Sequence, residues 1–535
     1  MRARRWPTTG LNITEKVLDG VPIKVYADRP LSLREVLRNA VSASPEKVAL
    51  IYQDQRITYG EFSRRADRVS SALQKLCGIG KGDRVAILFS NTVEFCVCYF
   101  AITQIGAICL PLNYRLNSQE AEYQLQDTGA RVLIFEEIYW DRIQPILPHL
   151  PQLKSFFITG SLTPPDLRNY KELEGWAETS FEEAPIDEED LASIMYTSGT
   201  TGRPKGAMLC HRNLICNAMT LSYVMKVTAA TKQMILTPLF HASALHSQLI
   251  SSVLKVGTSV IMKEFKTKES LELMAQEKVT LVIAVPTMYW FWVTHPEFDR
   301  YDLSSIEYTI SGAAPAAPEL IKLLAEKFPR SKFINAGGQT ESTSFTFALH
   351  PHDALKKLGS IGWVTPCNEI IVVDEKGKEL PLNETGELWF KGPAVCKGYW
   401  NNPQGTKETF TNGWLRTGDV GKVDEDGYLF LLDRKKDMII RGGENIYCIE
   451  VENALFSYPK VLEAAVVGVP DKIFGEQVKA AIVLKPGETA TEEEIRTFCL
   501  KHLADYKVPK YVTFLDALPR NPGGKVVKSI LRETK

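Results

Sequence analysis

The chain has 535 residues, 44% of them hydrophobic and 24% charged, which is typical of a globular protein of two or three domains and excludes a disordered chain or a short disulfide scaffold. Its 63 Lys and Arg nearly balance its 64 Asp and Glu. The chain therefore has no overall positive charge that would favour binding to nucleic acid or to an anionic membrane. Any anion is therefore expected to bind at a local site, and no nucleic-acid partner is expected.

The first ten residues, MRARRWPTTG, are basic but are not followed by the apolar stretch of a signal peptide. We expect them to form an unstructured basic tip. The ten cysteines have no zinc or redox spacing, and such sparse use is typical of a reducing compartment. We therefore expect a cytoplasmic protein.

From residue 30 to 180, helical patterns alternate with short apolar runs such as VALIYQ, RVAILF and RVLIFEE. The run at residues 95–112 suggests a membrane span, but it contains Gln104 and Gly106 and is broken by Pro111, which favours a buried helix feeding a strand. The alternation continues after residue 205 with QMILTPL, SVIMKEF, LVIAVP and KFINAGG. This alternation of helices and strands predicts an α/β fold around largely parallel sheets.

Beyond residue 360 the sequence changes to short strands broken by turns, and the tetrads DEKG and DEDG predict hairpins of an antiparallel subdomain. The final segment alternates helices and strands again, which predicts a compact α+β unit of about 100 residues. The aromatic run Tyr289, Trp290, Phe291 and Trp292 is expected to lie in the core rather than in a pocket wall.

The strongest functional signal is YTSGTTGRPKG at residues 196–206, which lies between an apolar strand candidate and helical sequence. Its backbone N–H groups, hydroxyls and the Lys205 ammonium can surround phosphate oxygens. The loop does not have the Walker A pattern, because Lys205 stands between Pro204 and Gly206. The sequence therefore predicts phosphate binding of a different class.

This loop resembles the signature of the adenylate-forming superfamily of acyl-CoA synthetases, peptide-synthetase adenylation domains and firefly-type luciferases, and further family motifs follow in order along nearly the whole chain. The resemblance implies an N-terminal adenylation domain at residues 1–435, which binds nucleotide and acid, and a mobile C-terminal lid domain at residues 436–535. It assigns nucleotide binding in the loop to Thr197, Ser198, Gly199, Thr200, Thr201, Gly202 and Lys205.

Two further segments are similar to family motifs around the acid and the adenine. In PLFH, His241 corresponds to the residue that lines the acid pocket. Ala244 stands where the family often has Gly, and we expect this exchange to narrow the pocket or reshape its mouth. In SGAAP, the small residues Gly312, Ala313 and Ala314 would allow the backbone to approach the adenine and the acyl group.

The motif QTE resembles the family segment that faces the phosphates. It assigns Gln339 to the nucleotide, Thr340 to the phosphate and Glu341 to Mg²⁺, a metal that prefers hard oxygen ligands. The family usually has an aromatic residue, most often Tyr, two residues before the Gln, where it stacks on adenine. This chain has Gly337 there, so either another side chain supplies the stacking or nucleotide affinity is reduced.

In the motif TGD, Asp419 resembles the carboxylate that accepts hydrogen bonds from the ribose hydroxyls. Arg434 resembles the arginine that reaches the ribose or phosphates, and Lys436 falls on the residue about which the C-terminal domain pivots. In RGGEN, Gly442 and Gly443 correspond to the pantetheine channel for CoA. Cys448 replaces a usual proline, and we expect a small buried residue rather than a nucleophile.

The last motif, PRNPGGKVVK, places Lys525 at the position of the family's catalytic lysine. When a carboxylate attacks the α-phosphorus of ATP, negative charge grows on the equatorial oxygens, and a positioned ammonium stabilises it. The resemblance thus implies a catalytic group of Lys525, Thr340, Glu341 and His241.

The activity implied is that of an ATP-dependent acyl-CoA ligase, which converts an acid, ATP and CoA into acyl-CoA, AMP and pyrophosphate through an acyl-adenylate, with Mg²⁺ as cofactor. The length of the chain and the pattern of its sequence look most like those of medium- or long-chain fatty acyl-CoA synthetases. An aromatic or alicyclic acid is the alternative substrate. A standalone enzyme that loads a carrier protein, luciferase-type oxygen chemistry and a non-catalytic nucleotide sensor remain open. The resemblance implies a monomer or a homodimer with no membrane span.

Overall fold

The computed structural model describes residues 3–161, 164, 167–197, 203–312, 316, 318–520 and 526–533. Its first large sheet has the strand order β11-β10-β6-β5-β7-β8-β9, and every pair of neighbours except β10 and β11 is parallel. The strands are β5 (Arg84–Leu88), β6 (Ile108–Pro111), β7 (Val132–Glu136), β8 (Ser155–Thr159), β9 (Arg168–Asn169), β10 (Leu191–Thr197) and β11 (Lys205–Cys210).

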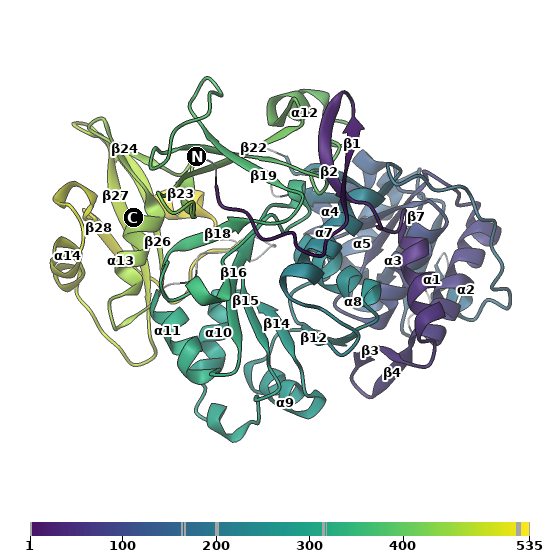
Figure 1. Cartoon of the computed structure of the whole chain (residues 1–535). Coiled ribbons are helices and arrows are strands. Elements are labelled where there is room, and N and C mark those ends of the chain that lie inside the picture. The colour runs from purple at the N-terminus through teal and green to yellow at the C-terminus, as the bar shows by residue number, and fades with distance from the viewer. Residues whose placement is uncertain are drawn as a thin grey trace.

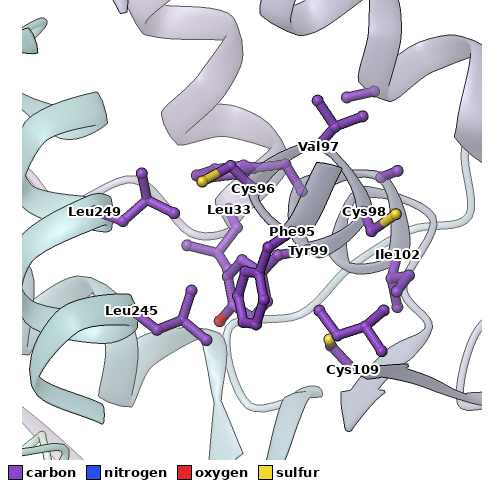
Figure 2. Packing of buried hydrophobic residues seen from close by; sticks show 14 of the residues in the cluster. Leu33, Phe95, Cys96, Val97, Cys98, Tyr99, Ile102, Cys109, Leu245 and Leu249 are labelled. Carbon is purple, nitrogen blue, oxygen red and sulfur yellow. The ribbon is translucent and has the colours of Figure 1, made fainter. Parts of the chain in front are cut away.

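The helices that belong to this first sheet come early in the chain (Figure 1). They are α1 (Leu33–Ala43), α2 (Tyr59–Cys77), α3 (Val93–Gln104), α4 (Ser118–Thr128), α5 (Trp140–Ile143) and α6 (Lys171–Glu174). Thr92 caps α3 by accepting a hydrogen bond from the backbone N–H of Phe95. Figure 2 shows α3 packed between Leu33 of α1, Cys109 of β6 and the later helical segment that carries Leu245 and Leu249.

Helix α3 is apolar on every face because it is buried on every face. The prediction of a buried helix that feeds a strand is confirmed by α3 and β6. None of the helices in the described ranges combines the length and the apolar character needed to cross a bilayer.

The second large sheet changes from parallel to antiparallel along its width. Its order is β19-β20-β22-β23-β18-β17-β16-β15-β14-β12-β13-β3-β4, with β21 paired to β22. The strands from β3 to β16 in this order are parallel, β4 pairs with β3 in antiparallel fashion, and the strands from β17 to β19 are antiparallel. The predicted alternation and the later antiparallel subdomain are therefore both confirmed.

The bounds of this second sheet and its helices are as follows. The strands are β3 (Val48–Tyr52), β4 (Gln55–Thr58), β12 (Lys232–Ile235), β13 (Thr258–Ile261), β14 (Leu281–Ala284), β15 (Tyr308–Ser311), β16 (Lys332–Gly337), β17 (Phe347–Ala348), β18 (Ser360–Val364), β19 (Glu369–Val373), β20 (Gly386–Lys391), β21 (Phe410–Thr411), β22 (Trp414–Val423) and β23 (Leu429–Arg434). The helices are α7 (His211–Val224), the π-helix η3 (Ser243–Leu249), α8 (Ile250–Leu254), α9 (Thr267–Glu277), α10 (Pro286–Val293), α11 (Pro318–Lys327) and α12 (Pro403–Thr409).

The C-terminal segment forms its own small sheet and core (Figure 1, yellow). Its strands are β24 (Ile439–Arg441), β25 (Glu444–Ile446), β26 (Val461–Asp471), β27 (Gly475–Leu484) and β28 (Tyr511–Phe514), and its helices are α13 (Cys448–Phe456), α14 (Glu492–Leu500) and α15 (Lys528–Glu533). The expected α+β unit is confirmed.

The described N-terminal residues contact distant parts of the chain, so the expectation of an unstructured tip is wrong for them. The Trp6 indole N–H donates to the carbonyl of Ala348 at 2.9 Å, and the Arg4 guanidinium lies 4.2 Å from the ring centre of Trp363. Trp6 is only 7% exposed, because the indole finds both an apolar environment and an acceptor. A hairpin of β1 (Ile13–Leu18) and β2 (Val21–Tyr26) follows.

Candidate active site

The predicted phosphate loop connects two antiparallel strands. Thr197, the last residue of β10, pairs with Lys205, the first of β11, and helix α7 begins only at His211. The expectation that the loop leads directly into a helix is therefore wrong. This segment forms a strand because β11 is hydrogen-bonded on both sides. β10 lies on one side, and on the other side the Met208 N–H donates to the carbonyl of Gly398 at 2.9 Å.

Five residues of the loop and both alanines assigned to the adenine turn lie outside the described residues. They are Ser198, Gly199, Thr200, Thr201 and Gly202, together with Ala313 and Ala314.

Tyr399 brings Lys205 and Glu341 together. The Tyr399 hydroxyl donates to Oε1 of Glu341 at 2.8 Å, and the Lys205 ammonium lies 5.0 Å from the centre of the same ring. Burial and the Glu341 carboxylate raise the pKa of Tyr399 well above its usual value, so the phenol stays protonated and donates. A lysine ammonium and a glutamate carboxylate thus contact one aromatic side chain.

Glu341 lies in the short helix η5 (Thr340–Ser342). Its backbone carbonyl accepts from the N–H of Cys396 at 2.8 Å, which ties η5 to the segment that carries Tyr399. Mg²⁺ is commonly bound by one or two carboxylates and the phosphates of a substrate. The partly exposed Glu341 carboxylate, which shares its partner Tyr399 with Lys205, fits such a site.

The Gln339 amide joins this group to two antiparallel strands. Its side-chain NH₂ donates to Oδ2 of Asp419 at 2.7 Å and to the carbonyl of Thr417 at 2.9 Å. Asp419 on β22 pairs with Arg434 on β23, and the Arg434 Nε lies 2.7 Å from the other Asp419 oxygen. Asp419 is 8% exposed, so this carboxylate is held in one orientation by donors on both oxygens.

Gly312 and Gly337 lie at the ends of the neighbouring parallel strands β15 and β16. A Cβ atom added to Gly312 would lie 2.9 Å from the carbonyl oxygen of Ala336, so the close approach of these strands requires a glycine. A Cβ atom on Gly337 would lie 2.9 Å from the ring of Phe347. Both glycines are partly exposed and lie at the carboxyl ends of their strands, where ligands of open α/β sheets bind.

His241 lies two residues before the π-helix η3, and the centre of its ring is 4.3 Å from the centre of the Phe240 ring. Asn217 connects this helix to the rest of the site, because it donates to the Ser247 hydroxyl at 2.8 Å and accepts from the N–H of Phe345 at 3.1 Å. A π-helical turn often marks a functional site. Ala244, in the same helix, is fully buried.

The expected hinge and CoA channel lie where the C-terminal sheet begins. Lys436 follows β23, and burial lowers its pKa. Gly442 and Gly443 form the two-residue turn between β24 and β25, with φ of 60° and 89°. Such a turn favours glycine at both positions. Cys448 is buried, as expected, and burial raises the pKa of its thiol.

The described contacts form two sets, one in which Tyr399 contacts both Lys205 and Glu341 and one in which Asp419 contacts Gln339 and Arg434. The two sets meet at η5, because Gln339 caps this short helix and Glu341 lies within it. Thr340 belongs to η5 as well, and Thr197 pairs with Lys205. Lys525 lies outside the described residues. Motif analysis missed Tyr399 and Phe347. A tyrosine next to Trp400 gives no signal of its partner Glu341, which is 58 residues away in the chain.

Two of the aromatic residues in the run of four belong to the core, as expected. Tyr289 and Trp292 are fully buried, and the Trp292 indole N–H donates to the Ser270 hydroxyl at 2.6 Å. Phe291 differs, because it is 45% exposed.

Comparison with known families gives two matches along the chain. The model described as AMP-binding enzyme matches residues 37–400, and the model described as AMP-binding enzyme C-terminal domain matches residues 450–525.

Among curated proteins, a feruloyl-CoA synthase of an Amycolatopsis species is 37% identical over 91% of this chain and 96% of its own length. The long-chain-fatty-acid–CoA ligase FadD13 of Mycobacterium tuberculosis is 36% identical over 93% of this chain and 97% of its own. Among solved structures, the anthranilate CoA ligase AuaEII in complex with anthranoyl-AMP has a TM-score of 0.89 and 29% identity, covering 95% of this chain and 98% of that one.

Proposed function

The chain belongs to the AMP-binding enzyme family and is an ATP-dependent, AMP-forming acyl-CoA ligase that works through an acyl-adenylate, and from this premise we propose that its acid substrate is a medium- or long-chain fatty acid. The roles of its residues are proposed with it. The observation that carries them is the convergence of Lys205, Glu341, Gln339, Asp419 and Arg434 from four segments of the chain.

In the first half-reaction, the acid carboxylate attacks the α-phosphorus of ATP and pyrophosphate leaves. Asp419 accepts hydrogen bonds from the ribose hydroxyls, and Arg434 holds the Asp419 carboxylate and reaches the ribose or the phosphates. Lys205, with the loop that begins at Thr197, and Thr340 stabilise the phosphate oxygens.

The metal site is completed by the substrate. Glu341 would hold Mg²⁺ together with phosphate oxygens, and the ion would neutralise the charge that develops on the departing pyrophosphate. Tyr399 fixes the orientation of Glu341 by donating to its Oε1. Lys525 contributes an ammonium to the transition state.

In the second half-reaction, the CoA thiol attacks the acyl carbonyl and AMP leaves. We assign this step to a rotation of the C-terminal domain, residues 436–535, about Lys436 relative to the N-terminal domain, residues 1–435. The rotation removes Lys525 and brings the Gly442–Gly443 turn to the site. The separate sheet and core of the C-terminal segment support this division.

The surroundings of His241 support a hydrocarbon substrate. Phe240, Ala242, Ala244 and Leu245 around His241 and along the start of η3 are apolar and buried, and apolar surroundings of this kind favour an acyl chain. FadD13, whose name gives a long-chain fatty acid, resembles this chain over most of its length.

An aromatic acid is the second candidate. The Phe240 ring lies between His241 and Tyr114, with ring centres 4.3 and 5.0 Å away, so an aromatic acid would find stacking partners beside His241. The names of two similar proteins, a feruloyl-CoA synthase and an anthranilate CoA ligase, favour the same class.

The two candidates are separated by the rates of AMP and acyl-CoA formation with acetate, straight-chain acids of increasing length, benzoate, cyclohexane carboxylate, anthranilate and ferulate. We expect equal amounts of AMP and acyl-CoA, with the highest kcat/KM for a straight-chain acid of medium or long chain. A maximum for ferulate or anthranilate would contradict the fatty-acid assignment and support the aromatic one. AMP release that does not depend on CoA would indicate a carrier protein as acceptor.

A further inference from the structure

Phe347 occupies the space above Gly337. The two residues face each other across the antiparallel pair β16 and β17, so their side-chain positions lie on the same face of the sheet. A Cβ atom built on Gly337 would lie 2.9 Å from Cζ and 3.0 Å from Cε2 of Phe347. The tip of the phenyl ring therefore covers the place where a side chain from residue 337 would begin.

The position of this ring is fixed by its neighbours. Ala348, the next residue of β17, pairs with Trp363 of β18, and its carbonyl accepts from the Trp6 indole. On the other side, the Phe347 ring packs edge to face against Phe390, with 6.1 Å between centres. Phe347 is nevertheless only partly buried, so the ring also contributes to an accessible surface.

That accessible surface adjoins the group that we assign to the nucleotide. Gly337 ends β16, and Gln339, two residues later, donates to Asp419. Gly312, which follows the adjacent strand β15, is partly exposed and lies so close to β16 that an added Cβ atom would lie 2.9 Å from the carbonyl oxygen of Ala336. A flat base with its ribose on Asp419 would reach this edge of the sheet, where ligands of open α/β sheets bind.

We propose that Phe347, presented from β17, is the aromatic wall against which the adenine of ATP and AMP stacks. Gly337 makes this possible, because any larger residue there would displace the ring. A base is held through its π-face by such a ring without any hydrogen bond. The proposal rests on the proposed nucleotide site and identifies a specificity residue within it.

The test compares AMP binding with pyrophosphate binding in the full-length chain, by calorimetry. Pyrophosphate has no base and therefore serves as the control ligand for the phosphate part of the site. Replacing Phe347 by Ala should weaken AMP about tenfold or more and leave pyrophosphate affinity unchanged. Phe347→Leu keeps an apolar side chain without a π-face and should weaken AMP as well.

The swap of the two residues gives a second, independent test. The backbone of Gly337 lies outside the left-handed region, so a tyrosine is sterically permitted once the Phe347 ring is removed. The double variant Gly337→Tyr with Phe347→Ala should recover AMP affinity to within about threefold of the wild type, by restoring a base-stacking ring.

Three results would overturn the proposal: AMP affinity within about twofold of wild type in a folded Phe347→Ala variant, an equal loss of pyrophosphate affinity, or no recovery in the double variant. Failure of the wild type itself to bind AMP would instead contradict the proposed function. Thermal unfolding of each variant confirms that it is folded.

Discussion

Tyr399 connects the cation and the carboxylate that we assign to the phosphates and the metal. Its hydroxyl donates to Glu341 and its ring faces Lys205, and these two contacts depend on different parts of the side chain. Glu341 is reached by the hydroxyl alone. Lys205 interacts with the π-face, which a phenylalanine would retain.

Tyr399→Phe should therefore affect the metal dependence of the reaction. Without the hydrogen bond the Glu341 carboxylate loses a fixed orientation, and we expect the half-saturating Mg²⁺ concentration to rise about threefold to tenfold. The KM for the acid should stay the same. The measurement is the rate of AMP formation as a function of Mg²⁺ at saturating ATP and acid.

Tyr26→Phe is the matched control, since Tyr26 is also buried and its hydroxyl makes a 2.8 Å hydrogen bond, with Thr220, away from the site. It should leave the Mg²⁺ dependence unchanged. An unchanged Mg²⁺ dependence in Tyr399→Phe would refute the role given to the hydroxyl.

The sequence was sufficient to identify residues that lie in short, chemically distinctive runs. Gln339 and Asp419 each belong to such a run, and the structure brings them within hydrogen-bonding distance. Phe347 and Tyr399 could not be identified in this way, because their roles arise from strand pairing and from a contact that only folding creates.

At the scale of elements, a network of charges ties the start of β10 to α7 and to the N-terminal hairpin. Glu189 accepts from Arg212 of α7 at 2.7 Å and from Lys16 of β1 at 3.1 Å. Arg212 is 4% exposed, so its charge needs this partner. Burial alone would raise the pKa of Glu189, but the hydrogen bonds from Arg212 and Lys16 lower it to about 2.

This lowered pKa gives Glu189 a pH-dependent contribution to stability. The folded value lies below the unfolded value of about 4.3, so the contribution is complete above that pH and is lost as the pH falls toward about 2. Glu189→Gln should lower the free energy of unfolding by about 2 kcal/mol at pH 7. The deficit relative to wild type should shrink at pH 3.

Urea unfolding of both proteins at pH 7 and at pH 3 measures this difference. A deficit of the same size at both pH values would mean that the charge of Glu189 does not stabilise the fold.

Elements were predicted well where a long apolar run gives a strong signal, as for α3 and β6. Two expectations failed for identifiable reasons. The glycine-rich loop led to β11 and not to a helix, because partners exist on both sides of that strand. The basic N-terminus is ordered because Trp6 and Arg4 find partners more than 340 residues away in the chain.

At the scale of the whole molecule, the predicted α/β class and the small C-terminal unit are both present in the structure. The proposed rotation of residues 436–535 requires that two residues of this unit serve different half-reactions. Lys525 would act before the rotation, and the Gly443 turn after it. The positive φ of Gly443, 89°, makes an alanine there strained although no atom lies within 4 Å of the added Cβ.

The proposed rotation can be tested by measuring the two half-reactions separately. Acid-dependent ATP–pyrophosphate exchange reports the first, and acyl-CoA formation from supplied acyl-adenylate reports the second. Lys525→Ala should lower exchange about a hundredfold or more and leave thioester formation intact. Gly443→Ala should lower thioester formation about tenfold, through strain in the turn, and leave exchange intact. Gly487→Ala, also at positive φ with no atom within 4 Å, should affect neither. Equal losses of both half-reactions in Lys525→Ala and Gly443→Ala would contradict the assignment of these two residues to different half-reactions.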